Sequence, residues 1–511
     1  MFTFPRGNAW TAFALALGLA ACTKDVTAPS STALESQPPS TNALAVNAAT
    51  ATTALNGVML QGFYWDTPVS NSQGTWWQVL NSQAADFASA GFTAIWLPPA
   101  YKGFSGSSKL DEGYGVYDRY DLGEFNQQGT VPTRYGTLSQ LQTCISTLHG
   151  QGLQVYEDMV MNHLTGADAQ ETVTMQDGTS HSVYTKFTYP GRGSTYSNYT
   201  WQWYNFNGAQ QAPNNGFYQW HDWDFATYDN NEAYDALLGS EIRYSDANQV
   251  NETISWGNWI TTKLNLDGYR VDAASHIQTD FLNKWFDNVK GTKFAVSEAW
   301  FDQVSYLTDY VTRTGGRTSL FDFPLHNLFV AMSSGNGSWD MQGLKNAGFT
   351  DADGVHAVSF VDNHDTDNGA SPVVNLKMLA YAYILLREKG YPCVFYKDYY
   401  PYNLGAQIKT LMGIRKTSAL GAGAEYPSAD TPDYYAYSRA GDGTTTAGHK
   451  GLMLVLNDSN ANITTKQLTS PFKSATLTDK TGNYAGTVTT NSSGVGTFPV
   501  KARSWSVWVV N

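Results

Sequence analysis

The sequence has little charge for its length. Charged residues make up 15% of the 511 residues, against roughly 25% in an average soluble domain. No run of lysine or arginine occurs, and the formal net charge is −13. Because nucleic-acid binding depends on basic patches that neutralise phosphates, this composition excludes nucleic acid as a partner.

Cysteine is nearly absent, with three residues in the chain. Cys144 lies in a segment with helical periodicity and Cys393 lies in an apolar run. Two cysteines so far apart do not make a disulfide framework, and no Cys/His spacing typical of zinc is present. We expect both to be buried as small hydrophobic residues.

Aromatic residues, by contrast, are abundant, at 14% of the chain with 16 Trp and 31 Tyr. A surface rich in tyrosine and tryptophan but poor in charge suits neutral, polyhydroxylated ligands, which stack on rings and form hydrogen bonds. Burial of aromatics in a large core would produce the same composition. The length allows two or three domains.

The first 22 residues have the organisation of an export signal. A thin positive region with Arg6 precedes an apolar stretch at 11–20 that is too short to span a bilayer. The closing Leu-Ala-Ala-Cys22 resembles the lipobox of bacterial lipoproteins, which predicts a lipid anchor on Cys22 at the cell envelope. Ordinary secretion is the alternative. Residues 23–55, rich in Ser, Thr, Ala and Pro, predict a flexible tether.

Short apolar runs alternate with helix-period segments from residue 57 onward. The runs are 57–63, 93–99, 153–160, 267–272, 293–300, 319–325, 356–362 and 391–397. Helical periodicity is found at 136–150, 246–264 and 376–389. Continuously apolar strands that alternate with helices indicate a parallel sheet covered on both faces. Eight such units predict a (β/α)8 barrel (TIM barrel), whose active site lies at the C-terminal ends of its strands.

Two regions interrupt this alternation. Residues 163–245 are dense in Gly, Asn, Tyr and Trp and predict an inserted irregular and β domain after the third strand. Residues 418–511 alternate polar and apolar residues between turn signals, which predicts a C-terminal antiparallel β-sandwich. The barrel is therefore expected over 56–162 and 246–417.

Acidic residues follow three of the predicted strands. GYRVD ends at Asp272, FAVSEAW carries Glu298, and HAVSFVDNHD carries Asp365. Glycoside hydrolysis needs one carboxylate as nucleophile and one carboxylic acid as proton donor. A single acid at a strand end more often only begins a loop, but recurrence at equivalent places favours a catalytic site.

Four strand-end motifs resemble the signature regions of the α-amylase family of glycoside hydrolases, in the family's order. They are DMVMNH (158–163), GYRVDAASH (268–276), SEAW (297–300) and FVDNHD (360–365). Further segments similar to bacterial liquefying-type α-amylases lie at 58–65, 112–137 and 387–400. The resemblance covers 56–511 and is weakest in the C-terminal domain.

The resemblance implies a monomer that hydrolyses internal α-1,4-glucosidic bonds of starch, glycogen and maltooligosaccharides with retention of configuration. An exo-acting, maltooligosaccharide-forming or transglycosylating relative shares these motifs and is the first alternative. A non-catalytic surface starch-binding lipoprotein is the second, although all three acids are present.

The resemblance also assigns catalytic roles. Asp272 would be the nucleophile, Glu298 the general acid and base, and Asp365 a carboxylate that grips the distorted sugar. Arg270, on the same face of the strand as Asp272, would keep the pKa of Asp272 low, whereas Glu298 would need a raised pKa. The Asp272 and Glu298 carboxyls should lie about 5–5.5 Å apart.

Other residues are implied in substrate binding. They are Tyr114, His163, Arg270, His276 and His364. Tyr114 would stack under the sugar at the cleavage point, and His163 and His364 would hydrogen-bond it. The chain departs from the family at Ser275, where relatives usually carry lysine, and at Lys397, where glycine is common.

The resemblance further implies a structural calcium ion, which prefers six to eight oxygen ligands. The implied ligands are the side chains of Asn162, Asp229 and Asp235 and the backbone carbonyl of His276. A solvated acidic loop is the alternative for the two aspartates, and Asp222 is a candidate for a second cation.

Overall fold

The computed structural model describes residues 57–104, 111–211, 216–224, 236–426, 431–443, 449–460 and 463–511. The predicted signal at 1–22 and tether at 23–55 lie outside these residues, as do Asp229 and Asp235. Within the described ranges, no helix combines the length and apolar character needed to cross a membrane.

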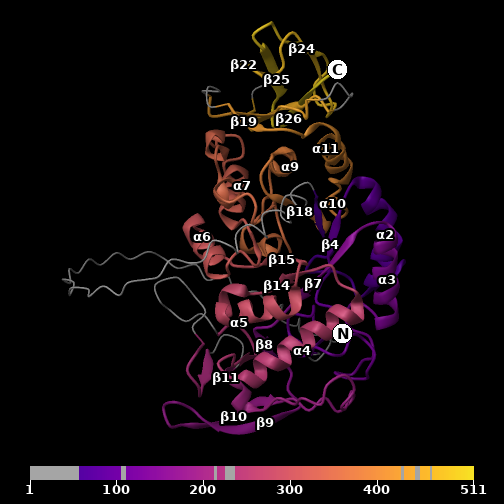
Figure 1. Ribbon diagram of the computed structural model, residues 1–511, viewed down its shortest axis with the longest axis vertical. Coiled ribbons are helices and arrows are strands. Elements are labelled where there is room, and N and C mark those ends of the chain that lie inside the picture. Colours follow the sequence, from indigo (N-terminus) through magenta and orange to yellow (C-terminus); the bar gives the residue numbers. More distant parts are fainter. Residues whose placement is uncertain are drawn as a thin grey trace, which may run out of the picture.

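Eight parallel strands form a closed barrel at the centre of the molecule, in the order β1-β18-β17-β16-β15-β14-β7-β4 (Figure 1). They are β1 (Met59–Gln61), β4 (Ala94–Trp96), β7 (Gln154–Met159), β14 (Gly268–Val271), β15 (Phe294–Ser297), β16 (Ser319–Phe321), β17 (Ala357–Phe360) and β18 (Tyr391–Phe395). Each lies within one predicted apolar run, so the predicted barrel is confirmed. The apolar runs are longer than the strands because buried residues of the adjoining loops continue the apolar pattern.

Helices cover the outside of the barrel. The main ones are α2 (Trp76–Ala90), α3 (Leu138–Gly150), α4 (Ala247–Leu264), α5 (Thr279–Trp285), α6 (Val304–Arg313), α7 (Phe323–Gly335), α9 (Lys377–Leu386) and α11 (Gly405–Ser418). Asp246 caps α4, as its side chain accepts a hydrogen bond from the Asn248 amide. The helix predicted at 376–389 corresponds to α9 and is shorter than expected, because the backbone becomes extended at Arg387.

Short elements fill the connections. They are β2 (Ser70–Asn71), β3 (Gly74–Thr75), β5 (Lys102–Gly103), β6 (Val116–Asp118), η2 (Ala274–His276), η3 (Phe286–Lys290), η4 (Met341–Leu344), α8 (Gly348–Ala352), η5 (Thr366–Ala370) and α10 (Tyr396–Tyr399). Several of them follow barrel strands at the C-terminal end, where η2 carries Ser275 and His276 of the candidate site.

The predicted insertion between β7 and α4 is β-rich. It holds β8 (His163–Leu164), β9 (Ala169–Thr174), β10 (Ser180–Lys186), η1 (Trp203–Asn205), β11 (Phe206–Gln210), β12 (Phe217–Gln219) and β13 (Ser240–Ile242). Strands β9 and β10 form a hairpin, and the others form a sheet in the order β12-β11-β13-β8. Because β8 directly follows β7 in the chain, its pairing with β13 ties this sheet to the end of the barrel.

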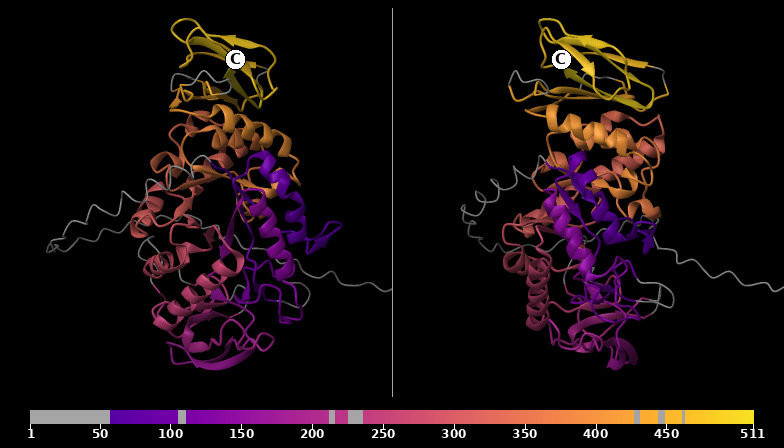
Figure 2. Two further views of the ribbon diagram at one scale, coloured as in Figure 1. Left: turned by 45° about the vertical axis from the view of Figure 1, so that its right-hand side comes forward. Right: turned by 90° about the vertical axis from the view of Figure 1, so that its right-hand side faces the viewer.

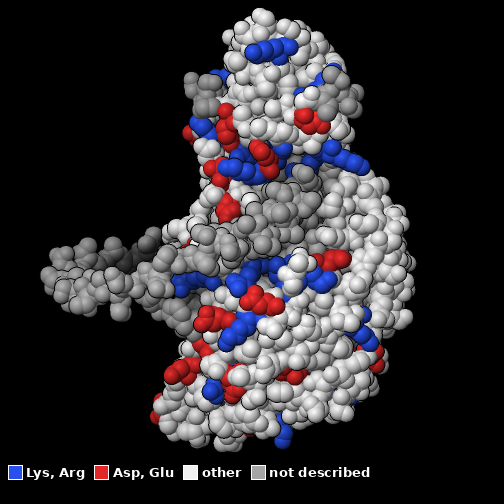
Figure 3. All heavy atoms as spheres, in the orientation of Figure 1, with Lys and Arg blue, Asp and Glu red and all other residues white. Residues whose placement is uncertain are grey.

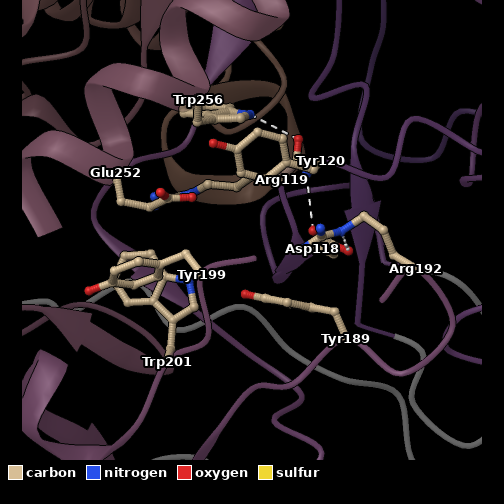
Figure 4. A pocket seen from close by; sticks show the side chains of 9 residues that line it. All are labelled: Asp118, Arg119, Tyr120, Tyr189, Arg192, Tyr199, Trp201, Glu252 and Trp256. Carbon is tan, nitrogen blue, oxygen red and sulfur yellow. Dashed lines mark hydrogen bonds and ion pairs between the residues drawn. The ribbon is translucent and has the colours of Figure 1, made fainter. Parts of the chain in front are cut away.

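A buried polar cluster anchors the insertion to the barrel (Figure 4). Arg192 of the insertion donates from Nε to Asp118 Oδ2 at 2.7 Å. Arg119 donates to the Met161 carbonyl at 2.9 Å, while Trp256 of α4 donates from its indole to the Arg119 carbonyl at 2.8 Å. The cluster encloses a cavity of about 10 Å³, which is close to the space one water molecule needs.

The C-terminal domain has two antiparallel sheets. Its strands are β19 (Gly423–Glu425), β20 (Tyr434–Arg439), β21 (Leu452–Asn457), β22 (Ile463–Thr469), β23 (Thr476–Asp479), β24 (Thr487–Thr489), β25 (Val495–Lys501) and β26 (Ser504–Val510). Six form one sheet, and β22 pairs with β25 in the other. Met453 and Val455 of the larger sheet share a core with Phe498 and Val500 of the smaller, as expected for a sandwich.

The three parts are arranged along the long axis of the molecule. Both views in Figure 2 show the C-terminal sheets at one end, the insertion at the other and the barrel between them. Helix α9 packs against β21 and β26, which joins the C-terminal domain to the barrel. Cys144 and Cys393 are both free and buried, as predicted.

Candidate active site

Arg270 lies at the centre of a charged cluster at the C-terminal end of the barrel. On β14 it pairs in register with Asp158 of β7, and its Nη1 lies 2.9 Å from Asp158 Oδ1. The same Nη1 lies 2.7 Å from Asp272 Oδ1, and Nη2 lies 2.7 Å from Glu298 Oε1. One guanidinium therefore holds three carboxyls, from the ends of three neighbouring strands, in one place.

Asp158 is the member of this cluster that the sequence analysis did not single out. Its carboxyl is fully buried and accepts hydrogen bonds from Trp96 Nε1 at 3.0 Å and from the Tyr114 hydroxyl at 2.8 Å. The Arg270 guanidinium also lies over the Trp96 ring, 5.0 Å from its centroid. Asp158 therefore orients the arginine side chain. In the sequence, the sign of its importance was its place as the first residue of the DMVMNH motif.

Glu298 is held by the backbone of the neighbouring strand end. Its Oε2 accepts from the Ala273 amide at 3.2 Å, and its own amide donates to the Val271 carbonyl at 2.9 Å. The Ala274 amide in turn donates to the Glu298 carbonyl at 2.9 Å. These contacts fix Glu298 relative to Asp272, which lies between Val271 and Ala273.

His364 connects Asp365 to the barrel floor. Its Nδ1 lies 3.0 Å from the Gln61 amide nitrogen, and its Nε2 lies 3.3 Å from Asp365 Oδ2. Burial and the Arg270 charge keep the pKa of His364 well below its usual range, so the ring is neutral. Since Gln61 donates to Nδ1, the proton sits on Nε2 and points to Asp365.

Aromatic rings form one wall. Tyr114 stacks on His364 with ring centroids 5.1 Å apart and an angle of 10°. Trp65 lies parallel to both, at 5.9 Å from each. His163 lies 2.8 Å from the Tyr114 carbonyl through Nε2, which sets the position of the tyrosine backbone.

These side chains line a cleft of about 400 Å³. The lining residues are Trp65, Tyr114, His163, Leu237, Leu238, Asp272, Ala273, Ser275, His276, Glu298, Trp300, His364 and Asp365. The three predicted acids therefore face one space, together with every predicted substrate-binding residue except Arg270, which lies beneath it. Trp65, Trp300 and the two leucines were not predicted.

Four carboxyls share the single charge of Arg270. Burial raises the pKa of Asp272 well above its usual range, and Arg270 only partly offsets this while Glu298 adds to it. The prediction that Arg270 holds the pKa of Asp272 low is therefore wrong in its net direction. Burial also raises the pKa of Asp158 to about 6, and burial with Glu298 raises that of Asp365 to about 7.

Comparison with known proteins identifies the family. The model for the α-amylase catalytic domain matches residues 85–402, and the model for the α-amylase C-terminal domain matches 452–509. The chain belongs to the α-amylase family of glycoside hydrolases. The family resemblance of the strand-end motifs is thereby confirmed.

Several relatives in this family match nearly the whole chain. The glucan 1,4-α-maltohexaosidase of Bacillus sp. (strain 707) is 38% identical over 489 residues, covering 89% of this chain and 92% of the relative. The α-amylase of Geobacillus stearothermophilus is 38% identical, covering 90% and 88%. The α-amylase of Bacillus licheniformis is 37% identical, covering 91% and 95%.

The fold of solved α-amylases is also similar. An Anoxybacillus α-amylase superposes with a TM-score of 0.64 at 16% identity, covering 89% of this chain and 98% of the other. The Geobacillus thermoleovorans α-amylase complexed with acarbose gives a TM-score of 0.60 at 17% identity, with the same coverage. These likenesses support the barrel and its appended domains.

The two departures from the family pattern lie in different surroundings. Ser275, on η2, lines the cleft beside His276. Lys397, on α10, pairs with Asp367 Oδ2 at 2.6 Å and lies 5.8 Å from the centre of the Tyr64 ring. Ser275 therefore changes the wall that a ligand meets, whereas the Lys397 charge is already matched by Asp367.

Part of the implied calcium site can be tested on the described residues. Asn162 donates to Glu241 Oε2, and Glu241 Oε1 accepts from the amides of Leu237 at 2.6 Å and Leu238 at 3.0 Å. Asn162 therefore lies beside the segment that follows Asp235, and Leu237 and Leu238 line the cleft together with His276. Amide, carboxylate and carbonyl oxygens at this junction are the donors that calcium prefers.

No group of three or more His, Cys, Asp or Glu side chains within the described ranges could hold a metal ion. The described donors thus fit a calcium ion only together with Asp229 and Asp235, which lie outside those ranges. Asp222, the candidate for a second cation, accepts from Gln176 at 2.8 Å on the exposed side of the insertion.

Proposed function

We propose that the protein hydrolyses internal α-1,4-glucosidic bonds of starch-like glucans with retention of configuration. The observation that carries this proposal is the Arg270 guanidinium, which contacts Asp272 through Nη1 and Glu298 through Nη2. Two carboxyls that pair with one guanidinium suit the short distance, about 5 Å, between the two catalytic carboxyls of retaining glycosidases.

In the first step, Asp272 attacks the anomeric carbon and the bond to the departing oxygen breaks. Glu298 gives its proton to that oxygen, so the leaving sugar departs neutral. A proton must be absent from Asp272 and present on Glu298 at this moment.

In the second step, Glu298 removes a proton from water, which attacks the glycosyl-enzyme and releases Asp272. Asp365 and His364 would bind hydroxyls of the distorted sugar, while Tyr114 offers its ring as a stacking surface. Two inversions at the anomeric carbon leave the α configuration in the product.

The alternatives concern the product pattern and catalysis itself. One relative carries the name of a maltohexaosidase and others that of α-amylases at nearly equal identity, so an exo-acting, maltooligosaccharide-forming enzyme remains the second candidate. A time course on amylose separates them: endo action lowers viscosity and chain length before short products accumulate, whereas exo action releases one product from the start.

The catalytic proposal is tested by Asp272→Asn. Because a covalent step cannot be replaced by positioning, we expect reducing-sugar release from soluble starch to fall by at least about 10⁴-fold, with an unchanged circular dichroism spectrum. A Ser275→Ala variant, which changes a cleft residue without reactive chemistry, is the matched control. Starch binding without hydrolysis by the wild-type protein would support the non-catalytic alternative.

We also propose that the chain is exported and anchored through a lipid on Cys22, with calcium joining the insertion to the barrel. The anchor rests on the sequence Leu-Ala-Ala-Cys22 and the segment 23–55. Cys22→Ala should move the protein from the membrane fraction to the soluble fraction of a bacterial host and abolish incorporation of labelled palmitate. Equal labelling of both forms would contradict the anchor.

A further inference from the structure

A second hollow lies where the barrel meets the C-terminal domain. Its volume is about 690 Å³, larger than that of the catalytic cleft. Its walls come from the chain after β17, from the segment between α10 and α11, and from the start of β26. The lining residues are Asp367, Pro372, Val373, Val374, Leu376, Lys377, Met378, Leu379, Tyr402, Leu404, Gln407, Arg503 and Trp505.

Two of these side chains are unusually exposed for their size and polarity. Val374 is 71% exposed and Tyr402 is 46% exposed. Exposed apolar and aromatic groups that gather at a concave surface mark binding sites more often than scattered single residues do.

The Tyr402 ring is held in place. Lys377 Nζ lies 4.9 Å from the ring centroid and Lys397 Nζ lies 5.3 Å from it. The hydroxyl lies 3.3 Å from Asp367 Oδ2. A ring held by two cations and a carboxylate loses little freedom when a ligand stacks on it, which favours binding.

The two lysines at the hollow are paired with carboxylates, and the arginine is hydrogen-bonded to a neutral amide. Lys377 pairs with Asp398 and, at 2.9 Å, with Asp362, while Lys397 pairs with Asp367. Arg503 donates to the Asn336 carbonyl at 3.0 Å. Figure 3 shows acidic and basic side chains beside one another where the C-terminal domain meets the barrel. The hollow therefore favours a neutral ligand with an apolar face and hydroxyl groups.

We propose that this hollow binds a stretch of α-glucan chain, with one glucose ring stacked on Tyr402 and another against Val374. The identity of the ligand rests on the proposed function. Asp365 lines the catalytic cleft and Asp367, two residues further along the chain, lines the hollow. A polymer held here is kept at high local concentration beside the cleft.

Adsorption to insoluble starch granules tests this proposal. The full-length protein is mixed with granules in the cold, and the unbound fraction gives the association constant. Tyr402→Ala removes the stacking ring and Val374→Asp places a charge on the apolar wall; each should weaken adsorption at least fivefold. The matched control is Tyr184→Ala, which removes a tyrosine that is 60% exposed on β10 and should adsorb like the wild type.

A short chromogenic maltoside reports on the catalytic cleft separately. If both variants adsorb like the wild type, the second site does not exist. If the variants lose adsorption and maltoside kcat/KM by the same factor, the hollow is part of the catalytic cleft and the proposal of a separate site fails. Loss of adsorption in a protein that cleaves no glucan would support the site and refute the proposed function.

Discussion

Burial lowers the pKa of His326, a histidine that is enclosed by the barrel and its helices. His326 on α7 lies 2.7 Å from the Val361 carbonyl through Nδ1 and 3.0 Å from the Ser371 hydroxyl through Nε2. Its ring stacks on Phe360 and is fully buried. In the neutral ring, Nδ1 donates to the carbonyl and Nε2 accepts from the hydroxyl.

A pH dependence of stability follows from His326. Burial lowers its pKa to about 4, whereas in the unfolded chain it titrates near ~6.5. As the pH falls through this window, only the unfolded state gains the proton, so the folded state loses stability between about pH 6.5 and pH 4. This loss is on the order of 3 kcal/mol.

We expect His326→Gln to be less stable than the wild type at pH 7 but to lose less unfolding free energy between pH 6.5 and pH 4. Denaturant melts at several pH values measure this. The change His181→Gln serves as the control, because it removes a half-buried histidine on β10, outside the buried core. Parallel curves for His326→Gln and the wild type would show that His326 carries no such linkage.

At the same scale, the sequence predicted most of the cleft. Asp272, Glu298 and Asp365 follow strands whose ends must meet in a barrel, so their convergence was predictable. Asp158 lies inside its strand, and although the DMVMNH motif includes it, its role depends on the register of β7 with Arg270, which the motif alone does not give. The direction of the Asp272 pKa was missed because burial, rather than the nearby arginine, dominates it.

At the scale of elements, two helical glycines have opposite surroundings. A Cβ at Gly257 of α4 would lie 2.8 Å from Trp285 Nε1 and 3.0 Å from Val289, and Trp285 is fully buried. A Cβ at Gly413 of α11 would meet nothing within 4 Å. Glycine thus permits the close approach of α4 to η3, whereas in α11 it has no packing role.

Substituting alanine at each position separates packing from helix propensity. Gly413→Ala should stabilise the protein by about 0.5–1 kcal/mol, because alanine costs less backbone entropy in a helix. Gly257→Ala should destabilise it by about 1–3 kcal/mol, because the overpacked Trp285 must shift. Thermal unfolding of both variants decides this, and a stabilising Gly257→Ala would mean that α4 moves aside freely.

The elements that were predicted lie in long sequence patterns. Helices α3 and α4 show a helical period, and all eight barrel strands lie in continuous apolar runs. Pairs such as β2 with β3 and β5 with β6 were not predicted, since a strand of two residues has no period. The end of α9 was missed because Arg387 turns away toward Glu425 and Tyr435 of the C-terminal domain.

At the scale of the whole molecule, the attachment of the insertion decides the effect of calcium removal. The polar cluster around Arg192 and the pairing of β8 with β13 hold the insertion without metal. An ion bound only by the folded state adds stability by mass action, about 4 kcal/mol at a thousandfold excess over Kd. Chelation should therefore lower the melting temperature by several degrees without unfolding the protein at room temperature.

Two variants at Asn162 test whether the response to chelator depends on the proposed site. Asn162→Ala removes the proposed oxygen ligand, and Asn162→Asp, which keeps one, is the matched control. We expect only the alanine variant to lose the response to chelator. A melting curve unchanged by excess chelator in the wild-type protein would count against structural calcium.

The closure of the barrel has a consequence for synthesis. Strand β1 pairs on one side with β4 and on the other with β18, so that Met59 lies beside Cys393. A ribosome delivers β1 long before β18, and until then both edges of the growing sheet stay unpaired. The barrel therefore cannot close until about four-fifths of the chain has been made.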